Sequence, residues 1–269
     1  MNILDQIIAN KQKEVTERKS LYPVKLLEKT IYFNSPGVSL KKYLLRDDLV
    51  GIIAEIKRKS PSKGMINKYV NVERTSIGYM QAGASALSVL TDTEFFAGKN
   101  EDLTIARKFN YCPILRKDFI IDEYQIIEAK SIGADVILLL ANVLNTAQVK
   151  EMAKFAKSLG LEVLLELRDK EELPAINEFV DAVGVNNRNL KDFTVNVDQS
   201  LIIGEQIPSD FVRVSESGIS DAKTIGKLKK AGFRGFLIGE TFMKHSRPEL
   251  ACANLIKEVS SLSAQTVVA

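Results

Sequence analysis

Residues 53–62 read IAEIKRKSPS and residues 114–119 read ILRKDF, so both stretches begin as apolar runs and end in charge. A strand that is covered on both faces of a sheet is nearly continuously apolar, and an unpaired charge buried there is costly. The charges at such strand ends are therefore either paired or used in chemistry. Because ligands bind at the carboxyl ends of the strands in parallel α/β folds, Lys57 and Lys117 are the first candidate functional residues.

Apolar runs alternate with helical patterns from about residue 50 onward. Residues 145–159 and 220–231 carry apolar side chains at the i, i+3, i+4, i+7 spacing of one buried helix face. Ser220 is expected to cap the second of these helices and Gly232 to end it. We predict eight strands between the helical stretches, at residues 51–57, 85–90, 112–117, 135–140, 162–167, 181–186, 211–215 and 235–238.

Four glycines support a chain of repeated strand–helix units. Gly83, Gly133, Gly160 and Gly232 each follow a helical pattern and precede a predicted strand, and a glycine just past a helix accepts the left-handed conformation that the turn requires. Eight such units predict an α/β fold, a closed (β/α)8 TIM barrel. The alternative is an open, doubly wound sheet, but no Gly-x-Gly-x-x-Gly run follows the first strand.

The N-terminal segment does not fit the repeat. Apolar residues with helical spacing lie between Ile3 and Ile8, and a charged stretch follows them. We predict one domain over residues 1–269, in which residues 1–48 form an N-terminal helical extension and residues 49–269 form the barrel. The extension is expected to cover one end of the barrel or to contribute to its pocket.

The composition excludes several classes of protein. The chain has 269 residues, 45% of them hydrophobic, and a net charge of +3, which argues against a general nucleic-acid binder. The start of the chain shows no signal-peptide pattern, and the longest apolar run is too short to span a bilayer. The two cysteines do not form a disulfide or zinc-binding pattern. We therefore expect a cytoplasmic protein that does not bind membranes.

His245 is the only histidine, and it lies in a polar stretch that is typical of a surface turn. Acid–base chemistry in this chain must then use Lys, Glu or Asp. Sites built from Ser, His and Asp, from Cys and His, or from several histidines around a metal are not expected. The sequence implies neither a metal nor a cofactor.

Carboxylates accompany the lysines at the predicted strand ends. Glu55 and Lys57 lie two residues apart and share one face of a strand, while Lys117 and Glu166 end two further strands. Any one of these pairs alone is more typical of a structural ion pair. Their convergence at one end of a barrel instead favours acid–base catalysis.

Small residues follow the last two predicted strands, at Ser217-Gly218 and at Gly239. Barrels frequently bind phosphate at the loops after their seventh and eighth strands, although two ordinary glycine turns are the alternative. The pattern therefore predicts a lyase or isomerase that acts on a phosphorylated small molecule.

The stretches 53–62, 115–119, 184–190 and 215–219 resemble those of the indole-3-glycerol-phosphate synthase family of tryptophan biosynthesis. The resemblance covers essentially the whole chain, including the N-terminal extension. The first two motifs are specific in combination, whereas the Ser-Gly and Gly-Glu junctions occur in many phosphate-binding barrels. Membership would imply closure of 1-(2-carboxyphenylamino)-1-deoxyribulose 5-phosphate to indole-3-glycerol phosphate, with loss of carbon dioxide and water.

The resemblance also implies roles for individual residues. Four catalytic residues are implied. Lys117 would be the general acid and Glu166 the general base. Lys57 would bind an anionic group and could serve as an acid in dehydration, and Glu55 would orient and tune the lysines. Glu240 stands where a serine occurs in some members, so its side chain is expected to point away from phosphate. The implied substrate-binding residues are Ser60, Phe119, Asn186, Arg188, Leu190 and Ser217, and the implied phosphate-binding residues are Gly218, Gly239 and Glu240.

Three alternatives to this function stay open at the level of the sequence. The chain could be another phosphate-binding barrel, such as phosphoribosylanthranilate isomerase, or an aldolase with a Schiff base on Lys57 or Lys117. It could also be an anion-binding barrel without turnover. The loop from Arg58 to Gly64 is either a lid over the substrate or a solvated loop. Association with other enzymes of the pathway cannot be read from the sequence.

Overall fold

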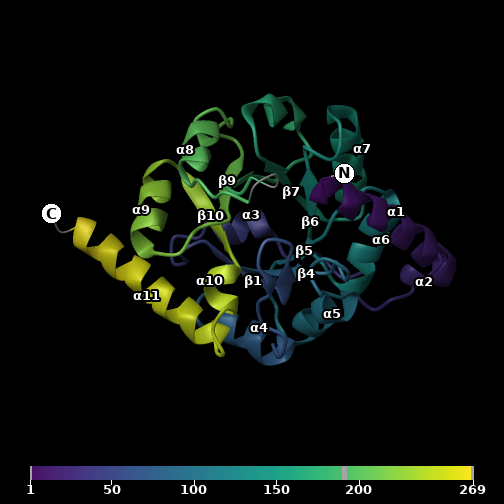
Figure 1. Cartoon of the computed structure of the whole chain (residues 1–269), viewed down its shortest axis with the longest axis horizontal. Coiled ribbons are helices and arrows are strands. Elements are labelled where there is room, and N and C mark those ends of the chain that lie inside the picture. Colours follow the sequence, from purple (N-terminus) through teal and green to yellow (C-terminus); the bar gives the residue numbers. More distant parts are fainter. Residues whose placement is uncertain (1, 190–192, 268–269) are drawn as a thin grey trace.

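Eight parallel strands close into a barrel in the computed structural model, which describes residues 2–189 and 193–267 (Figure 1). Each strand pairs with its neighbours in the ring order β1-β10-β9-β8-β7-β6-β5-β4. The predicted (β/α)8 TIM barrel and its eight strands are confirmed, and the open sheet is excluded. The barrel strands are β1 (Ile52–Ile56), β4 (Ala86–Leu90), β5 (Ile114–Lys117), β6 (Val136–Leu140), β7 (Glu162–Leu167), β8 (Ala182–Asn186), β9 (Val212–Glu216) and β10 (Phe233–Ile238).

Helices surround the barrel and bury the outer faces of its strands. The two helices predicted at residues 145–159 and 220–231 are confirmed, but Asp221 rather than Ser220 caps the second one, because the Asp221 carboxylate accepts from the Thr224 N–H. The outer elements are α4 (Val72–Gln81), α5 (Asn100–Phe109), α6 (Glu123–Ile132), α7 (Thr146–Ser158), the 3-10 helix η1 (Lys170–Ala175), α8 (Asp198–Gly204), α9 (Ala222–Lys230), α10 (Glu240–Met243) and α11 (Pro248–Val267).

The four junction glycines all have positive φ, with values of 94° at Gly83, 97° at Gly133, 72° at Gly160 and 87° at Gly232. Each therefore makes the left-handed turn from a helix into the next strand, as the sequence predicts. Among the described residues, no helix combines the length and the apolar character that a membrane span needs.

The N-terminal extension forms three helices, α1 (Ile3–Leu21), α2 (Val24–Leu27) and α3 (Leu40–Leu44). In α3, Leu40 and Leu44 pack against the apolar residues inside the barrel and close its amino-terminal end. The first helix, α1, lies beside α6 at the other end (Figure 1). The extension thus contacts both ends of the barrel, which supports the single domain that we predict.

One buried lysine fixes α1 to the barrel. Lys11 is 1% exposed, and its Nζ lies 3.0 Å from Asp92 Oδ2 and 2.9 Å from Asp118 Oδ1. Glu14 Oε2, one turn further along α1, is 2.8 Å from the same nitrogen. Asp92 and Asp118 follow β4 and β5 at their carboxyl ends, and Asp118 is adjacent to Lys117. The helix is therefore joined to the barrel beside the predicted site.

The alternation of side chains along the strands places charge at one end of the barrel interior. Ile53, Leu115 and Leu164 belong to the apolar cluster inside the barrel. Side chains two residues apart share a face of a strand, so the inward positions that follow them toward the carboxyl end are Glu55, Lys117 and Glu166. The lower part of the interior is apolar, and its upper rim is ionic.

Candidate active site

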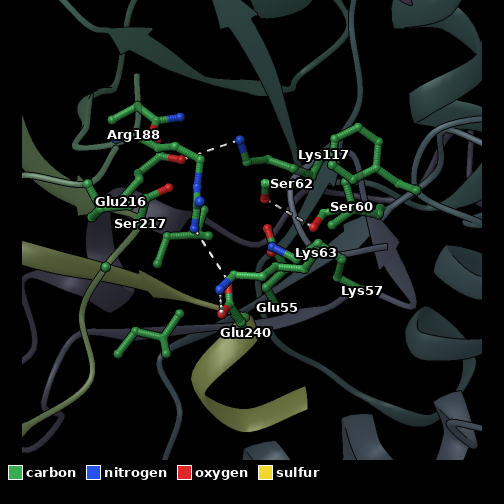
Figure 2. Close-up of a pocket in the computed structure, with 18 of the residues that line it drawn as sticks. Glu55, Lys57, Ser60, Ser62, Lys63, Lys117, Arg188, Glu216, Ser217 and Glu240 are labelled. Atoms are coloured by element: carbon green, nitrogen blue, oxygen red, sulfur yellow. Dashed lines mark hydrogen bonds and ion pairs between the residues drawn. The ribbon is translucent and has the colours of Figure 1, made fainter. Parts of the chain in front are cut away.

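A pocket of about 700 Å³ opens at the carboxyl ends of the barrel strands (Figure 2). This volume is typical of sites for small molecules. Leu190 lies outside the described residues. All the other predicted site residues line this one pocket, and they are Glu55, Lys57, Ser60, Lys117, Phe119, Glu166, Asn186, Arg188, Ser217, Gly218, Gly239 and Glu240.

Lys117 ends β5 and contacts two carboxyl groups from other strands, and Figure 2 labels one of them, Glu216. Its Nζ lies 2.9 Å from Glu166 Oε2 and 3.3 Å from Glu216 Oε2. Burial alone would lower the pKa of Lys117, but attraction to Glu166, Glu216 and Glu55 outweighs burial and raises this pKa. Lys117 is therefore held as an ammonium group among carboxyl groups.

Glu166 and Glu216 are both buried, yet their pKa values are shifted in opposite directions. Burial favours the neutral form of each, but the charges of Lys117 and Arg168 outweigh it at Glu166, and Asn186 Nδ2 donates to Glu166 Oε1 at 2.9 Å. The pKa of Glu166 is lowered to about 2. At Glu216, burial outweighs the attraction of Lys117 and raises the pKa to about 8. Of the two carboxyl groups that flank the ammonium, Glu166 thus gives up its proton far more readily than Glu216.

Two glycines leave room for the carboxyl groups of the site. A Cβ atom on Gly184 would lie 2.2 Å from Glu216 Oε1, and a Cβ on Gly239 would lie 2.3 Å from Glu55 Oε1. Either distance is too short for a real Cβ contact. Both positions therefore leave space for the neighbouring carboxyl group because glycine has no side chain. Lys57 Nζ lies 2.6 Å from the same Glu55 oxygen, as their shared strand face predicts.

Glu240 turns toward two cations at the rim of the pocket (Figure 2). Its Oε2 is 3.4 Å from a guanidinium nitrogen of Arg188, and its Oε1 is 3.5 Å from Lys63 Nζ. The expectation that this side chain points away from phosphate stays a prediction, since it concerns a bound group, but the carboxylate does lie at the pocket rim. The carboxylate is attracted by two charges that come from distant parts of the sequence.

The loop from Arg58 to Gly64 carries a short hairpin, with β2 at Lys59–Ser60 and β3 at Gly64–Met65. The Arg58 guanidinium forms a buried ion pair with Asp102 in α5, and Ser60 faces the pocket. The start of the loop is thus fixed to the barrel, and its tip reaches Glu240 through Lys63. Its closure over a substrate stays a prediction.

Apolar side chains form one wall of the pocket. Phe119 and Phe96 lie with their ring centroids 5.9 Å apart, and Leu140 lies at the end of β6. Ile3 and Ile7 of the N-terminal helix α1 line the same pocket, so the extension contributes to the site as well as to the barrel ends. Such a wall suits a flat aromatic group.

The turn after β9 has an unusual backbone. Ser217 has a φ of 70° and Gly218 a φ of 76°, so a serine occupies the left-handed region that glycine normally takes. Backbone strain of this kind gathers at functional sites. A Cβ on Gly218 would lie 2.2 Å from Val195 Cγ1, so the turn also packs closely on the loop after β8.

Sequence reasoning missed several residues of the pocket, namely Glu216, Arg168, Lys63, Ile3 and Ile7. Glu216 and Arg168 each stand at or just past the end of an apolar strand, the same signal that identifies Lys117. Ile3 and Ile7 show only the spacing of a helix, and this spacing does not indicate which surface the helix covers. His245 is exposed, as predicted. Within the described part of the chain, no group of His, Cys, Asp and Glu side chains could hold a metal ion.

A (β/α)8 barrel with lysines and glutamates gathered at the carboxyl ends of its strands has the form of an acid–base enzyme of the TIM-barrel class. The family model for indole-3-glycerol phosphate synthase matches residues 4–255. The chain therefore belongs to the indole-3-glycerol phosphate synthase family, a family of carboxy-lyases in tryptophan biosynthesis.

Relatives from several bacteria agree with this family. The chain is 48% identical over 258 residues to an indole-3-glycerol phosphate synthase of Bacteroides thetaiotaomicron, covering 96% of this chain and 99% of the relative. It is 40% identical over 268 residues to that of Salinibacter ruber, covering 98% and 99%. Because these matches include the extension, the relatives share the whole length of the chain.

Solved structures with low sequence identity show the same fold. A thiamine phosphate pyrophosphorylase from Pyrococcus furiosus superposes with a TM-score of 0.61 at 14% identity, over 83% of this chain and 99% of its own. A 3-hexulose-6-phosphate synthase from Salmonella typhimurium gives 0.58 at 14% identity, over 80% and 99%. These likenesses show a shared barrel and no more.

Proposed function

We propose that the chain closes 1-(2-carboxyphenylamino)-1-deoxyribulose 5-phosphate to indole-3-glycerol phosphate, with loss of carbon dioxide and water. The observation that carries the proposal is the buried contact of 2.9 Å between Lys117 Nζ and Glu166 Oε2 inside the pocket. It supplies a cationic donor and an anionic acceptor side by side. Family membership supplies the reaction in which such a pair is needed.

Lys117 is the proposed general acid. As the aromatic carbon attacks the ribulose carbonyl, negative charge develops on the carbonyl oxygen, and a preorganised ammonium stabilises that charge. Glu166 is ionised and is the proposed general base for proton removal and dehydration. Glu216, whose pKa is raised, lies 3.3 Å from Lys117 and is placed to return a proton to its amine after the ammonium has donated one.

The remaining residues are proposed to hold the substrate. Lys57 and Arg188 face an anionic group, and the planar guanidinium suits a carboxylate or a phosphate. The turn at Ser217 and Gly218 is proposed to hold the phosphate together with Gly239 and Glu240, whose contribution would come from backbone N–H groups. The wall formed by Phe96, Phe119, Leu140 and the two isoleucines of α1 is proposed to hold the aromatic ring.

The raised pKa of Lys117 argues against the aldolase alternative with a Schiff base on Lys117. A lysine that forms a Schiff base must be available as the free amine, which requires a lowered pKa. Lys117 is instead kept protonated by the carboxylates around it, Glu166 first among them. Treatment with borohydride in the presence of substrate should therefore leave the protein without a covalent adduct. Location in the cytoplasm and independence from a metal or cofactor stay predictions.

The test is to incubate the protein with the carboxyphenylamino-deoxyribulose phosphate and to follow indole fluorescence. The background is low because this chain contains no Trp. Lys117→Met should lower kcat by about 10²–10⁴-fold while the substrate still binds. Lys227→Met is the matched control, because Lys227 pairs with Asp198 on the surface. Nearly unchanged product formation by Lys117→Met would refute the assignment of the acid.

A further inference from the structure

Asn187 directly follows β8 and is 4% exposed. Its Nδ2 donates to Ser217 O at 3.0 Å and to Ser215 Oγ at 3.1 Å. Its Oδ1 accepts from the Ser200 N–H at 3.1 Å and from Ser200 Oγ at 2.8 Å. A side-chain amide has two N–H donors and an oxygen with two acceptor sites, so every hydrogen-bonding site of this amide is used.

The partners of Asn187 are themselves fixed. Ser200 in α8 and Ser215 in β9 are fully buried, and their hydroxyl oxygens lie 2.7 Å apart. The three side chains therefore form a closed, buried network that joins β8, α8 and β9. A buried network whose members are all satisfied is rigid, and the loss of any one member leaves a costly unpaired group. The network gives Asn187 a fixed position from which to hold the backbone of Ser217.

Ser217 needs such support because of its backbone. A left-handed conformation is unfavourable for a residue with a Cβ and persists only when its surroundings impose it. Ser217 has a φ of 70°, and its carbonyl oxygen accepts from Asn187. The next residue, Gly218, lines the pocket. The direction in which this turn presents its N–H groups thus depends on the Asn187 amide.

We propose that Asn187 is a positioning residue, which holds the Ser217–Gly218 turn in its left-handed form and thereby sets the affinity of the pocket for the phosphate group. The inference rests on the proposed function in that it takes this turn as the phosphate site. The Asn187 side chain does not line the pocket, so it acts through the turn. Its backbone N–H donates to Glu216 O at 2.9 Å, and a substitution of the side chain leaves that hydrogen bond in place.

The first test is the kinetics of Asn187→Ala. The variant should raise KM for the phosphorylated substrate by about tenfold and change kcat by less than about threefold, because binding is lost and the reacting groups stay in place. Asn110→Ala is the matched control, since the Asn110 amide makes two hydrogen bonds at the opposite end of the barrel. An unchanged KM in folded Asn187→Ala would overturn the inference.

A second variant covers the case in which Asn187→Ala fails to fold. Asn187→Asp keeps the shape of the side chain but replaces the donor to Ser217 O by an oxygen, so its KM should rise at least as much. A double-mutant cycle then tests the route of action. Since glycine adopts the left-handed conformation without strain, Asn187→Ala should raise KM by less than about threefold in a Ser217→Gly background. Equal effects in both backgrounds would contradict action through the turn.

Binding of inorganic phosphate separates this inference from the proposed reaction. Titration calorimetry should show that Asn187→Ala binds phosphate about tenfold more weakly than the unmodified chain. Weaker binding in a chain that forms no indole product would support the positioning role and refute the proposed reaction. Equal phosphate affinity in a chain that does form the product would refute the positioning role alone.

Discussion

Substitution of Lys11 by methionine tests how the N-terminal helix is held on the barrel. Methionine has a similar length and removes only the charge. The Lys11 ammonium is 1% exposed and lies within 3.0 Å of oxygens of Glu14, Asp92 and Asp118. Asp118 keeps Arg116 and Thr91 as partners. Among the described residues, Asp92 Oδ2 has no hydrogen-bond partner, and Lys11 is the cation that pairs with it. The variant therefore leaves a buried carboxylate without its counter-ion.

The expected loss of unfolding free energy in Lys11→Met is large. Removal of one partner from a buried ion pair costs about 3–5 kcal/mol of unfolding free energy. In a domain of this size 1 kcal/mol corresponds to about 2–4 °C, so the midpoint of thermal unfolding should fall by roughly 6–20 °C. Lys19→Met is the control on the same helix. The ion pair of Lys19 with Asp122 is half exposed, and its loss should cost less than about 1 kcal/mol.

The pH dependence of the loss follows from Asp118. Burial would raise the pKa of its carboxyl group, but Lys11 and Arg116 outweigh burial and hold it below the usual range. A lowered folded-state pKa contributes stability above the unfolded-state pKa and loses it as the pH falls. Without Lys11 the buried carboxylates take up protons more readily, so the defect of Lys11→Met should be full at pH 7 and smaller at pH 4. Calorimetric unfolding measures both values, and a loss at pH 7 no larger than that of Lys19→Met would refute this reasoning.

Two further predictions concern Glu216. Gly184→Ala would force the Glu216 carboxyl group away from Lys117, because the new Cβ would lie 2.2 Å from Oε1, and kcat should fall by about 10²-fold. Gly226→Ala in α9 is the control, since no described atom lies within 4 Å of a Cβ there. This control should retain activity and gain up to about 1 kcal/mol in unfolding free energy. The raised pKa of Glu216 means that the folded chain binds the extra proton, so stability should fall as the pH rises from 4.5 to about 8, at up to about 1.4 kcal/mol per pH unit. Glu216→Gln should lack this decline, and parallel stability profiles for the two chains would contradict the assignment.

The barrel and most of the pocket could be predicted from the sequence because their signals are local. A buried parallel strand is an apolar run of fixed length, and the inward position after its last apolar residue is set by alternation. Glu55, Lys117 and Glu166 were found in this way. The hairpin of β2 and β3 was missed because strands of two residues have no periodicity to read. Its presence depends on contacts such as the ion pair between Arg58 and Asp102.

The features that the sequence could not give depend on groups far apart in the chain. Glu240 turns into the pocket because Arg188 and Lys63 attract it, and nothing near residue 240 indicates these partners. Asp221 rather than Ser220 caps α9, and the sequence does not distinguish the two because Asp and Ser have similar capping preference. The role of Gly184 shows only when Glu216 is seen against it. For Glu240 and Gly184 the deciding contact joins residues far apart in the chain, whereas the cap at Asp221 is a local contact with Thr224.

The opposite pKa shifts of Glu166 and Glu216 distinguish two carboxyl groups at one barrel mouth by their affinity for a proton. Both carboxyl groups are buried and contact the same ammonium, so neither burial nor Lys117 distinguishes them. The difference comes from the loop after β7, where Arg168 adds a second cation, and from Asn186, which donates to Glu166. Glu216 has neither contact, and within the described part of the chain its Oε1 has no hydrogen-bond partner. Two carboxyl groups with separated pKa values are what acid–base chemistry at neutral pH requires. Here Arg168 and Asn186 help to lower the pKa of Glu166, while burial and the charges of Glu166 and Glu55 raise that of Glu216.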